Sequence, residues 1–598
     1  MKRSHYDLKF CFLLLIFSGF AFVALGANLL GIEMQPGWGL PRKVLFGIGA
    51  GGLVLTLVYK GILEIEKWIL KRQEGVSVET NRRGNSPSGR SKWIAKLAIP
   101  GFLMAVLALY VGFVSVWNWT DWPSSTNLYG LLGESFIQGK TNLPIEPSPL
   151  LADLENPYLT SERAGIPVET DLSYFNKKYY MYWGPAPALF AAMVILLTGQ
   201  IPGDELIIFL SISAVFLFSF GIIRSLKQRF FSSIPGWLYA VGIFSIATSF
   251  PFLWILNSPD IYGAAIASGQ AFLLGGLFFA LPIFGGGSAP RWRLILAGAF
   301  WILAIGSRLI LAVPVAVLLL GIFIQWILQA RKNGNWAKPI PALIFLGMPM
   351  LVGLILLGSY NYVRFGDFFE TGLRYSLNPH DLWKNIPKGW VFNPRYLLSD
   401  LFYYFLTPIR VVTRFPFLKP YWGPVDLFAR LLEPLGIPSI YTIDNSVGLL
   451  FTTPTLLFAV YLIRPLFEGW RVCVQNRDAA PGKRLNQAFS FEARFTLGFI
   501  LLAGIAASLP ILTYFYVSCR YMLDFLPLLN IPIVAGMWQL FRVHNHFPIR
   551  RWLTPLLIIS FVTYSAGIGF ILALTGAQTR FDDLNPTLYS VLFQFFRY

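Results

Sequence analysis

Runs of about 20 apolar residues recur along almost the whole chain, and this feature constrains the fold most. A helix of that length crosses the hydrocarbon core of a bilayer. Of the 598 residues, 55% are hydrophobic and only 13% are charged, whereas soluble domains carry about 25% charged residues. Because polar surface has to cover a water-soluble particle, a soluble enzyme is excluded. The sequence predicts an all-α polytopic membrane protein.

About thirteen of the apolar runs are expected to cross the membrane. They are 8–31, 43–60, 93–118, 203–224, 233–256, 262–284, 293–306, 309–329, 339–360, 446–465, 495–516, 521–541 and 552–575. The first run could instead be a cleaved signal peptide, because Lys2 and Arg3 precede it and Ala24-Leu25-Gly26 resembles a cleavage site.

Residues 185–199 are apolar but form a run of only about 15 residues, shorter than most spans. If this run crossed the bilayer, the basic groups around Arg224, Arg291 and Arg331 would lie outside the cell, against the positive-inside rule. We therefore expect an interfacial helix here, with the N-terminus cytoplasmic and the C-terminus outside.

This topology divides the chain into four parts and leaves two long segments on the outer face. The parts are two N-terminal spans (1–70), a cytoplasmic linker (71–92), a membrane module (93–541) and a last span with an outer tail (542–598); the long segments are 119–202 and 361–445. Both segments are rich in aromatic residues and Pro, and long loops are usually functional or disordered. We expect them to be ordered and to carry the active site.

The net charge of +18 does not indicate a nucleic-acid partner in this chain. Its basic residues lie in the short connections between apolar runs, where they orient the protein in the membrane. Three scattered cysteines, Cys11, Cys473 and Cys519, are too few for a disulfide framework or a metal site.

The first long segment is acidic in an otherwise basic protein. Residues 119–180 contain eight acidic residues but only four basic ones. Carboxylates held at a membrane face can act as general bases or bind a divalent metal ion, although most acidic residues in a loop are simply solvated. Asp171 is the first candidate because it leads into an aromatic, Pro-rich run. Asp121, directly after an apolar run, is the second.

Two arginines interrupt apolar runs. Arg308 separates 293–306 from 309–329, and Arg520 separates 495–516 from 521–541. Ionisable groups within a membrane are costly and usually functional. Arg520 and Asp524 are four residues apart and could form a structural pair. Alternatively, Arg308 and Arg520 bind a phosphate at the outer leaflet, which suits the planar guanidinium.

The second long segment begins with aromatic residues that alternate with charged ones. Arg364, Glu370 and Arg374 lie among Tyr and Phe residues, which could stack on a sugar and contact an anionic head group. The same residues could equally form an aromatic belt at the membrane interface.

Several short motifs together resemble the GT-C superfamily of integral-membrane glycosyltransferases, which includes protein O-mannosyltransferases and the aminoarabinose transferase of lipid A. More closely, the chain looks like bacterial membrane proteins of that superfamily. The motifs are Tyr129 to Lys140 (YGLLGESFIQGK), Asn156-Pro157-Tyr158, Asp171 to Pro187, Tyr262 to Phe272, Ser307-Arg308, Tyr360 to Tyr375, and Arg520-Tyr521 to Pro527.

The resemblance implies a polyprenyl-phosphate-linked sugar as donor, transfer with inversion, and a lipid, glycan or protein acceptor on the outer face. An aspartate of the first outer loop would be the catalytic base, and arginines or a divalent metal ion would neutralise the departing phosphate. We expect Arg308, Arg520 and Arg364 to bind the phosphate. Expected substrate contacts are Tyr129, Tyr180, Tyr262, Tyr521, Glu370 and Arg374.

One departure from the family pattern leaves alternatives open. Family members usually carry an acid three or four positions before the tyrosine that matches Tyr129, where this chain has Ser125 and Thr126. Either Asp121 takes that role, or Asp171 does, or the chain is a non-catalytic membrane subunit. A lipid or polysaccharide transporter or flippase is a further alternative, although no internal repeat of the transporter type is visible.

Overall fold

The computed structural model describes residues 89–336, 340–413, 415–424, 436–463, 465–466, 490–544, 548–575 and 580–595, together with seven isolated positions between 18 and 49. By contact, the chain divides into one unit of residues 1–123 and 197–200, and a second of 124–196 and 201–598. Apart from those isolated positions, the spans expected at 8–31 and 43–60 lie outside the described residues, as does most of the linker.

Eight helices of the described chain are long and apolar enough to cross a membrane. They are α6 (Asp204–Phe230), α7 and α8 together (Gly236–Ala247 and Phe250–Asn257), α9 (Ile261–Phe284), α11 (Ala312–Asn333) with the short η2 before it (Leu309–Leu311), α12 (Ile340–Phe365), α18 (Phe491–Ile511), α19 (Leu526–His544) and α20 (Pro548–Thr575). The first unit contains α3 (Gly89–Val114), which covers most of the span expected at 93–118.

The expected count of thirteen spans is not confirmed, and two of the expected spans differ in form. Residues 446–465 do not make one continuous helix: α16 (Leu449–Thr452) stops before the 3₁₀ helix η7 (Pro454–Ala459). The residue before a proline disfavours helical angles, and Thr453 indeed has φ −137°. α10 (Arg291–Ile305) has 15 residues and measures about 22 Å, less than the bilayer core of about 30 Å.

α9 is the central helix of the bundle and packs against α6, α10 and α11. In its most apolar 18-residue stretch, 83% of the residues are buried, compared with 11% in α12. Small residues allow this close packing, because Gly275 faces Phe300 and Gly276 faces Trp301. The first residues of α9 therefore have a firmly held position at the end of the bundle.

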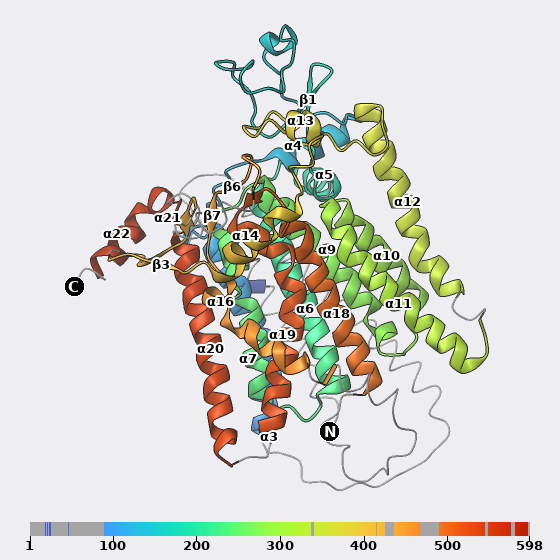
Figure 1. Ribbon diagram of the computed structural model, residues 1–598. Helices are drawn as coiled ribbons and strands as arrows, with labels where there is room; N and C mark the ends of the chain where they lie inside the picture. The colour runs from blue at the N-terminus through green and yellow to red at the C-terminus, as the bar shows by residue number, and fades with distance from the viewer. Residues whose placement is uncertain are drawn as a thin grey trace. The chain divides into compact units, whose positions relative to one another are not determined.

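Short helices and strands fill the two long segments. The first segment contains α4 (Leu128–Ile137), η1 (Pro149–Ala152), β1 (Ser173–Phe175), β2 (Lys178–Tyr180) and α5 (Ala186–Thr198). The second contains η3 (Leu373–Tyr375), α13 (Leu382–Asn385), η4 (Pro394–Tyr396), α14 (Leu397–Leu401), the π-helical η5 (Phe402–Leu406), β3 (Arg410–Val411), β4 (Leu418–Lys419), β5 (Tyr421–Trp422) and β6 (Thr442–Ile443). In Figure 1, α4, α5, β1 and α13 lie at one end of the bundle.

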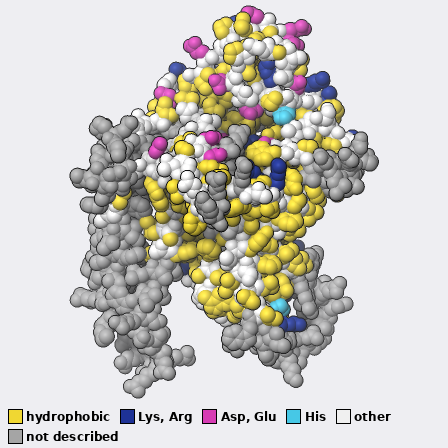
Figure 2. Space-filling view, turned by 90° about the vertical axis from the view of Figure 1, so that its left-hand side faces the viewer, with side chains coloured by type: hydrophobic (Ala, Val, Ile, Leu, Met, Phe, Trp, Pro, Cys, Tyr) yellow, Lys and Arg dark blue, Asp and Glu magenta, His cyan; other side chains and the backbone are white. Residues whose placement is uncertain are grey.

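The two long segments hold each other through backbone hydrogen bonds. The Leu377 N–H donates to the Leu172 carbonyl at 2.9 Å, and the Asp171 N–H donates to the Leu377 carbonyl at 3.3 Å. The buried Arg163 donates to the carbonyls of Tyr158, at 2.9 Å, and of Asn378. On the face shown in Figure 2, most visible acidic side chains lie at the upper end, above a largely hydrophobic surface.

The later parts of the chain return to the same end. β7 (Asn445–Ser446) pairs with β5, and β8 (Tyr516–Val517) runs parallel to β6, with Thr442 opposite Tyr516. The 3₁₀ helix η8 (Cys519–Asp524) follows β8 directly. After α20 come α21 (Arg580–Leu584) and α22 (Pro586–Phe595).

The helix expected at 185–199 is α5, with 13 residues. At about 20 Å it is too short to cross the bilayer core. Its interfacial location stays a prediction.

Candidate active site

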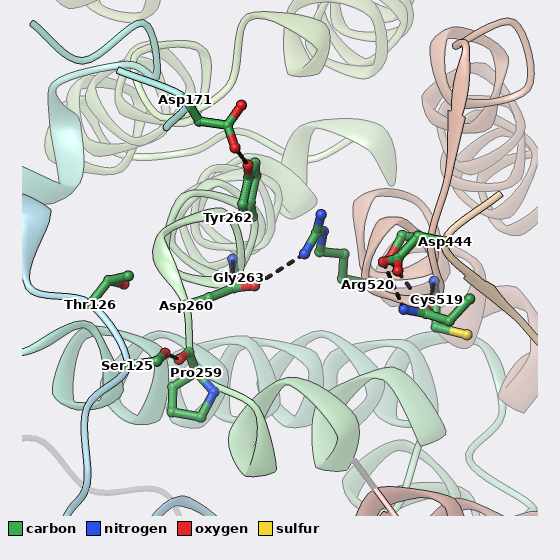
Figure 3. A network of polar contacts seen from close by, with 12 residues as sticks. Ser125, Thr126, Asp171, Pro259, Asp260, Tyr262, Gly263, Asp444, Cys519 and Arg520 are labelled. Atoms are coloured by element: carbon green, nitrogen blue, oxygen red, sulfur yellow. Dashed lines mark hydrogen bonds and ion pairs between the residues drawn. The ribbon is translucent and has the colours of Figure 1, made fainter. Parts of the chain in front are cut away.

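Asp171 lies just before β1 and points toward the start of α9. Its carboxylate accepts a hydrogen bond from the hydroxyl of Tyr262, the second residue of α9 (Figure 3). The backbone of Asp171 has φ 66°, in the left-handed region that few residues other than glycine adopt and that aspartate and asparagine tolerate best. The backbone bond to Leu377 holds this conformation.

The environment of Asp171 suits a proton acceptor. Burial raises the pKa of its carboxyl above the ordinary aspartate value, while the Tyr262 hydrogen bond and the positive charge of Arg520 partly oppose that rise. His380, from the second long segment, also lowers the pKa of Asp171. A carboxylate with a raised pKa is a stronger base than an exposed aspartate.

Arg520 lies beside the same end of α9. Its Nη1 is 3.1 Å from Oδ2 of Asp260, and its guanidinium lies 4.1 Å from the centroid of the Tyr262 ring. Asp260 also caps α9, because its Oδ1 accepts the Gly263 N–H at 2.5 Å. One carboxylate therefore both starts the helix that carries Tyr262 and orients Arg520.

Asp444 adds a third carboxylate near Arg520. The pairing of β6 with β8 continues through the Asp444 N–H, which donates to the Val517 carbonyl at 3.0 Å. Oδ2 of Asp444 accepts hydrogen bonds from Asn445 at 2.8 Å and from Ser518 at 3.3 Å. Burial raises the pKa of Asp444, and the charge of Arg520 opposes that rise.

Arg308 lies in the turn between α10 and η2. Its Nη2 is 2.9 Å from Oδ2 of Asp524, whose side chain is fully buried. The guanidinium groups of Arg308 and Arg520 lie 5.4 and 5.5 Å from the centroid of the Tyr521 ring. The Nε atoms of both arginines are buried and have no hydrogen-bond partner among the described residues. Each arginine can therefore donate hydrogen bonds in addition to the one it donates to its carboxylate partner.

The pair that the sequence suggested between Arg520 and Asp524 is not formed. Residues 519–524 form a 3₁₀ helix with about three residues per turn, so positions four apart do not share a face. Each residue instead pairs with a distant part of the chain: Arg520 with Asp260, and Asp524 with Arg308.

Tyr129 contacts the Pro-rich run that follows Asp171, and this run packs on the turn that carries Arg308. Tyr129 is fully buried in α4, and its hydroxyl donates to the Gly184 carbonyl at 3.3 Å. The Ala186 N–H in turn donates to the Gly306 carbonyl at 3.0 Å, two residues before Arg308. Gly184 packs directly on that turn, because a Cβ built at position 184 would overlap the Gly306 carbonyl.

We expect Gly184→Ala to shift the turn that carries Arg308 and to lower stability by about 1–3 kcal/mol through overpacking against backbone atoms. Gly347→Ala in α12 is the matched control, since its Cβ would meet no atom within 4 Å. Thermal unfolding in detergent compares the two. If both variants are equally stable, the turn accommodates the added methyl group with no loss of folding free energy.

A second group of predicted residues clusters around Phe365, at the end of α12. Arg364 is buried, with Nη1 donating to the Met181 carbonyl at 2.5 Å and Nη2 to Asn361 at 2.7 Å. Tyr180 packs on Phe365 with ring centroids 5.4 Å apart. The remaining two predicted residues are Glu370, which accepts the Gly372 N–H at 2.7 Å, and Arg374, which lies 4.0 Å from the Trp383 ring centroid. Among the described contacts, this group anchors the second long segment.

The segment that lacks the expected acid is hydrogen-bonded to one carboxylate and to the backbone next to another. Thr126 donates to Asp204, at the start of α6, and Ser125 donates to the carbonyl of Pro259, next to Asp260. Asp121 belongs to the other unit, and its side chain is exposed.

Sequence reasoning missed Asp260, Asp444 and His380. For Asp260 a signal was present, because an aspartate directly before a long apolar run is a typical helix N-cap. Asp444 and His380 reach the site through pairing between distant segments, for which the sequence carries no local signal.

No group of three or more His, Cys, Asp or Glu side chains that could hold a metal ion occurs in the described part of the chain. Asp171 and Asp260 are also engaged by Tyr262 and Arg520. These residues do not fit a resident divalent ion, so no chemical step is assigned to one.

No protein-family model and no curated protein sequence matches the chain. Solved structures do resemble it. One is an oligosaccharyltransferase from Archaeoglobus fulgidus (12% identity, TM-score 0.39), with 81% of this chain and 57% of that chain covered. Another is ArnT from Cupriavidus metallidurans bound to undecaprenyl phosphate (12% identity, TM-score 0.37), with 82% and 78% covered. The chain thus spans little more than half the length of the oligosaccharyltransferase.

Proposed function

We propose that the protein is a membrane glycosyltransferase that moves a sugar from a polyprenyl-phosphate donor to an acceptor hydroxyl. The observation that carries the proposal is the convergence of a buried carboxylate, Asp171, with two arginines that retain donor capacity, Arg308 and Arg520. Asp171 and Arg520 both contact Tyr262 in the first turn of α9. Arg308 and Arg520 both lie against the ring of Tyr521. The motif resemblance supports the same chemistry. The positive-inside rule, applied to the basic connections between apolar runs, favours the outer face of the plasma membrane for this site.

Asp171 would act as the general base. It takes the proton from the acceptor hydroxyl while the hydroxyl oxygen attacks the anomeric carbon of the donor sugar. The bond between that carbon and the phosphate oxygen breaks, and its electron pair leaves with the polyprenyl phosphate. Attack opposite the leaving group inverts the configuration. Tyr262 holds the carboxylate in position through its hydrogen bond.

Arg308 and Arg520 would stabilise the charge that develops on the leaving phosphate. Guanidinium groups suit phosphate oxygens, and charge stabilisation is strong where water is largely excluded. The side chains of Arg308 and Arg520 are 15% and 18% exposed, so a ligand can reach them from one side. Arg364 has its donors engaged by Met181 and Asn361, which favours a structural role over phosphate binding.

Binding of a polyprenyl phosphate to the purified protein tests the phosphate site. A ligand present at a hundred times its dissociation constant stabilises the native state by about 2.7 kcal/mol. The melting temperature should therefore rise with polyprenyl phosphate and rise less with the polyprenol of equal length, which lacks the phosphate. Arg520→Lys should weaken the effect, because lysine keeps the charge but loses the planar fork. Equal stabilisation by phosphate and alcohol would exclude a phosphate site.

The pH dependence of transfer should follow Asp171. The base must be ionised, so activity is lost as the pH falls through its pKa, which burial raises above the ordinary value of about 4. The acid limb of the rate profile should therefore lie above that value. Tyr262→Phe removes a hydrogen bond that lowers the pKa, and it should move this limb to higher pH. If the acid limb of Tyr262→Phe lies at the same pH as that of the unaltered protein, the ionisation of Asp171 does not control the rate of transfer.

A further inference from the structure

The C-terminal helix α22 is amphipathic although it contains no charged residue. Its polar residues recur at intervals of three and four, and its apolar residues recur in the same way on another side. The polar stripe is Thr587, Ser590 and Gln594; the apolar stripe is Leu588, Val591, Leu592 and Phe595. This spacing places the two stripes on different faces of one helix.

The apolar stripe is partly exposed in the folded chain, most strongly at Val591 and Phe595. No residue of α22 is buried, and the side chains of Val591 and Phe595 are 58% and 74% exposed. A third side of the helix makes the protein contacts, because the Tyr589 ring packs on Phe415 and Phe581 at centroid distances of 5.7 and 6.0 Å. Tyr589 thus packs on the protein, while Val591 and Phe595 keep most of their side-chain surface exposed.

Contacts to the same β-hairpin keep α22 near the end of the candidate span α20. The apolar part of α20, residues 553–575, is about 34 Å long and crosses a core of about 30 Å. α22 begins eleven residues after the end of that span. In Figure 1, α22 runs away from the end of α20 instead of continuing along it. A helix in this position meets the boundary between lipid head groups and acyl chains.

We propose that α22 lies in the membrane interface, with its apolar stripe in lipid and its polar stripe in water. Its partner is the bilayer itself. Interfacial helices are recognised by separate apolar and polar faces, as in α22. Because the polar stripe of α22 is uncharged, its insertion depends on apolar area and not on anionic head groups.

This anchor holds a hairpin of the second long segment at the membrane. The Tyr589 hydroxyl donates to the Phe415 carbonyl at 3.5 Å, and Thr575, at the end of α20, donates to the Leu418 carbonyl at 2.7 Å. Both carbonyls belong to the connection and second strand of the β3–β4 hairpin. The hairpin is thereby fixed to the last span on one side and to the interfacial helix on the other.

Spin-label accessibility in the full-length protein tests the proposal. A nitroxide amino acid is introduced by stop-codon suppression at position 591 or 590, and the protein is reconstituted into phosphatidylcholine vesicles. Oxygen concentrates in lipid and a nickel chelate in water. The ratio of oxygen to nickel accessibility at position 591 should exceed that at position 590 severalfold. Adding phosphatidylglycerol should leave the ratio unchanged.

Two outcomes overturn the proposal. If position 591 is as accessible to the nickel chelate as position 590, the helix lies in water. If position 591 is shielded from both reagents and the shielding disappears when the protein is diluted in lipid, a second copy of the chain covers the stripe. Neither outcome depends on transferase activity, so the result is independent of the proposed function.

Discussion

Asp171→Asn should lower sugar transfer by about 10²–10⁴-fold, the range that a general base contributes, while the protein stays folded. Asparagine has the shape of aspartate and tolerates the left-handed backbone at this position, and its amide oxygen can still accept the Tyr262 hydroxyl. It cannot take a proton. The rate of transfer in proteoliposomes, normalised to the amount of folded protein, measures the effect.

Glu169→Gln is the matched control, because it removes an exposed carboxylate two residues away in the same segment. Its transfer rate should remain normal. If Asp171→Asn also keeps a near-normal rate, the base is another residue, with Asp260 and Asp121 as the next candidates. Normal folding of both variants separates loss of chemistry from loss of structure.

The second large effect concerns the buried pair of Arg308 and Asp524. Asp524→Asn leaves the Arg308 charge without its partner, and breaking a buried pair costs about 3–5 kcal/mol of folding free energy. Replacing both residues by leucine removes both charges and should recover most of that stability. Thermal unfolding in detergent, compared across the single and double variants, measures the cost and the recovery.

Asp260→Asn is the control for that experiment. Its pair with Arg520 is partly exposed, with side-chain exposures of 30% and 18%, so its loss should cost about 1 kcal/mol or less. Asparagine also retains the cap of α9. If the leucine double variant regains both stability and binding of polyprenyl phosphate, Arg308 is structural and does not bind the donor.

The long helices could be predicted from the sequence, because a membrane span needs only length and apolar composition. The runs expected at 262–284 and 309–329 correspond to α9 and to the candidate span 309–332, and no end differs by more than three residues. The prediction failed where local backbone chemistry decides the geometry, as at Pro454, which follows the end of α16, and at the 3₁₀ helix of residues 519–524.

The site could be predicted only as separate residues. Asp171, Tyr262, Arg308, Arg520 and Tyr521 were all candidates, and the structure brings them together. Their partners could not be found, because the two ion pairs join residues 216 and 260 positions apart. Pairing rules from sequence act over one helical turn, which led to Asp524 as the partner of Arg520.

Mass spectrometry of the polyprenyl lipids tests the central claim most directly. Proteoliposomes that contain the protein, the Asp171→Asn variant or no protein are incubated with polyprenyl-phosphate-linked sugars and a membrane extract as the source of acceptors. With the unaltered protein, the glycosylated lipid should decrease and free polyprenyl phosphate should appear in equal amount. Both controls should show neither change. Donor lipids that remain intact with the unaltered protein, or that are consumed equally by Asp171→Asn, would contradict the account.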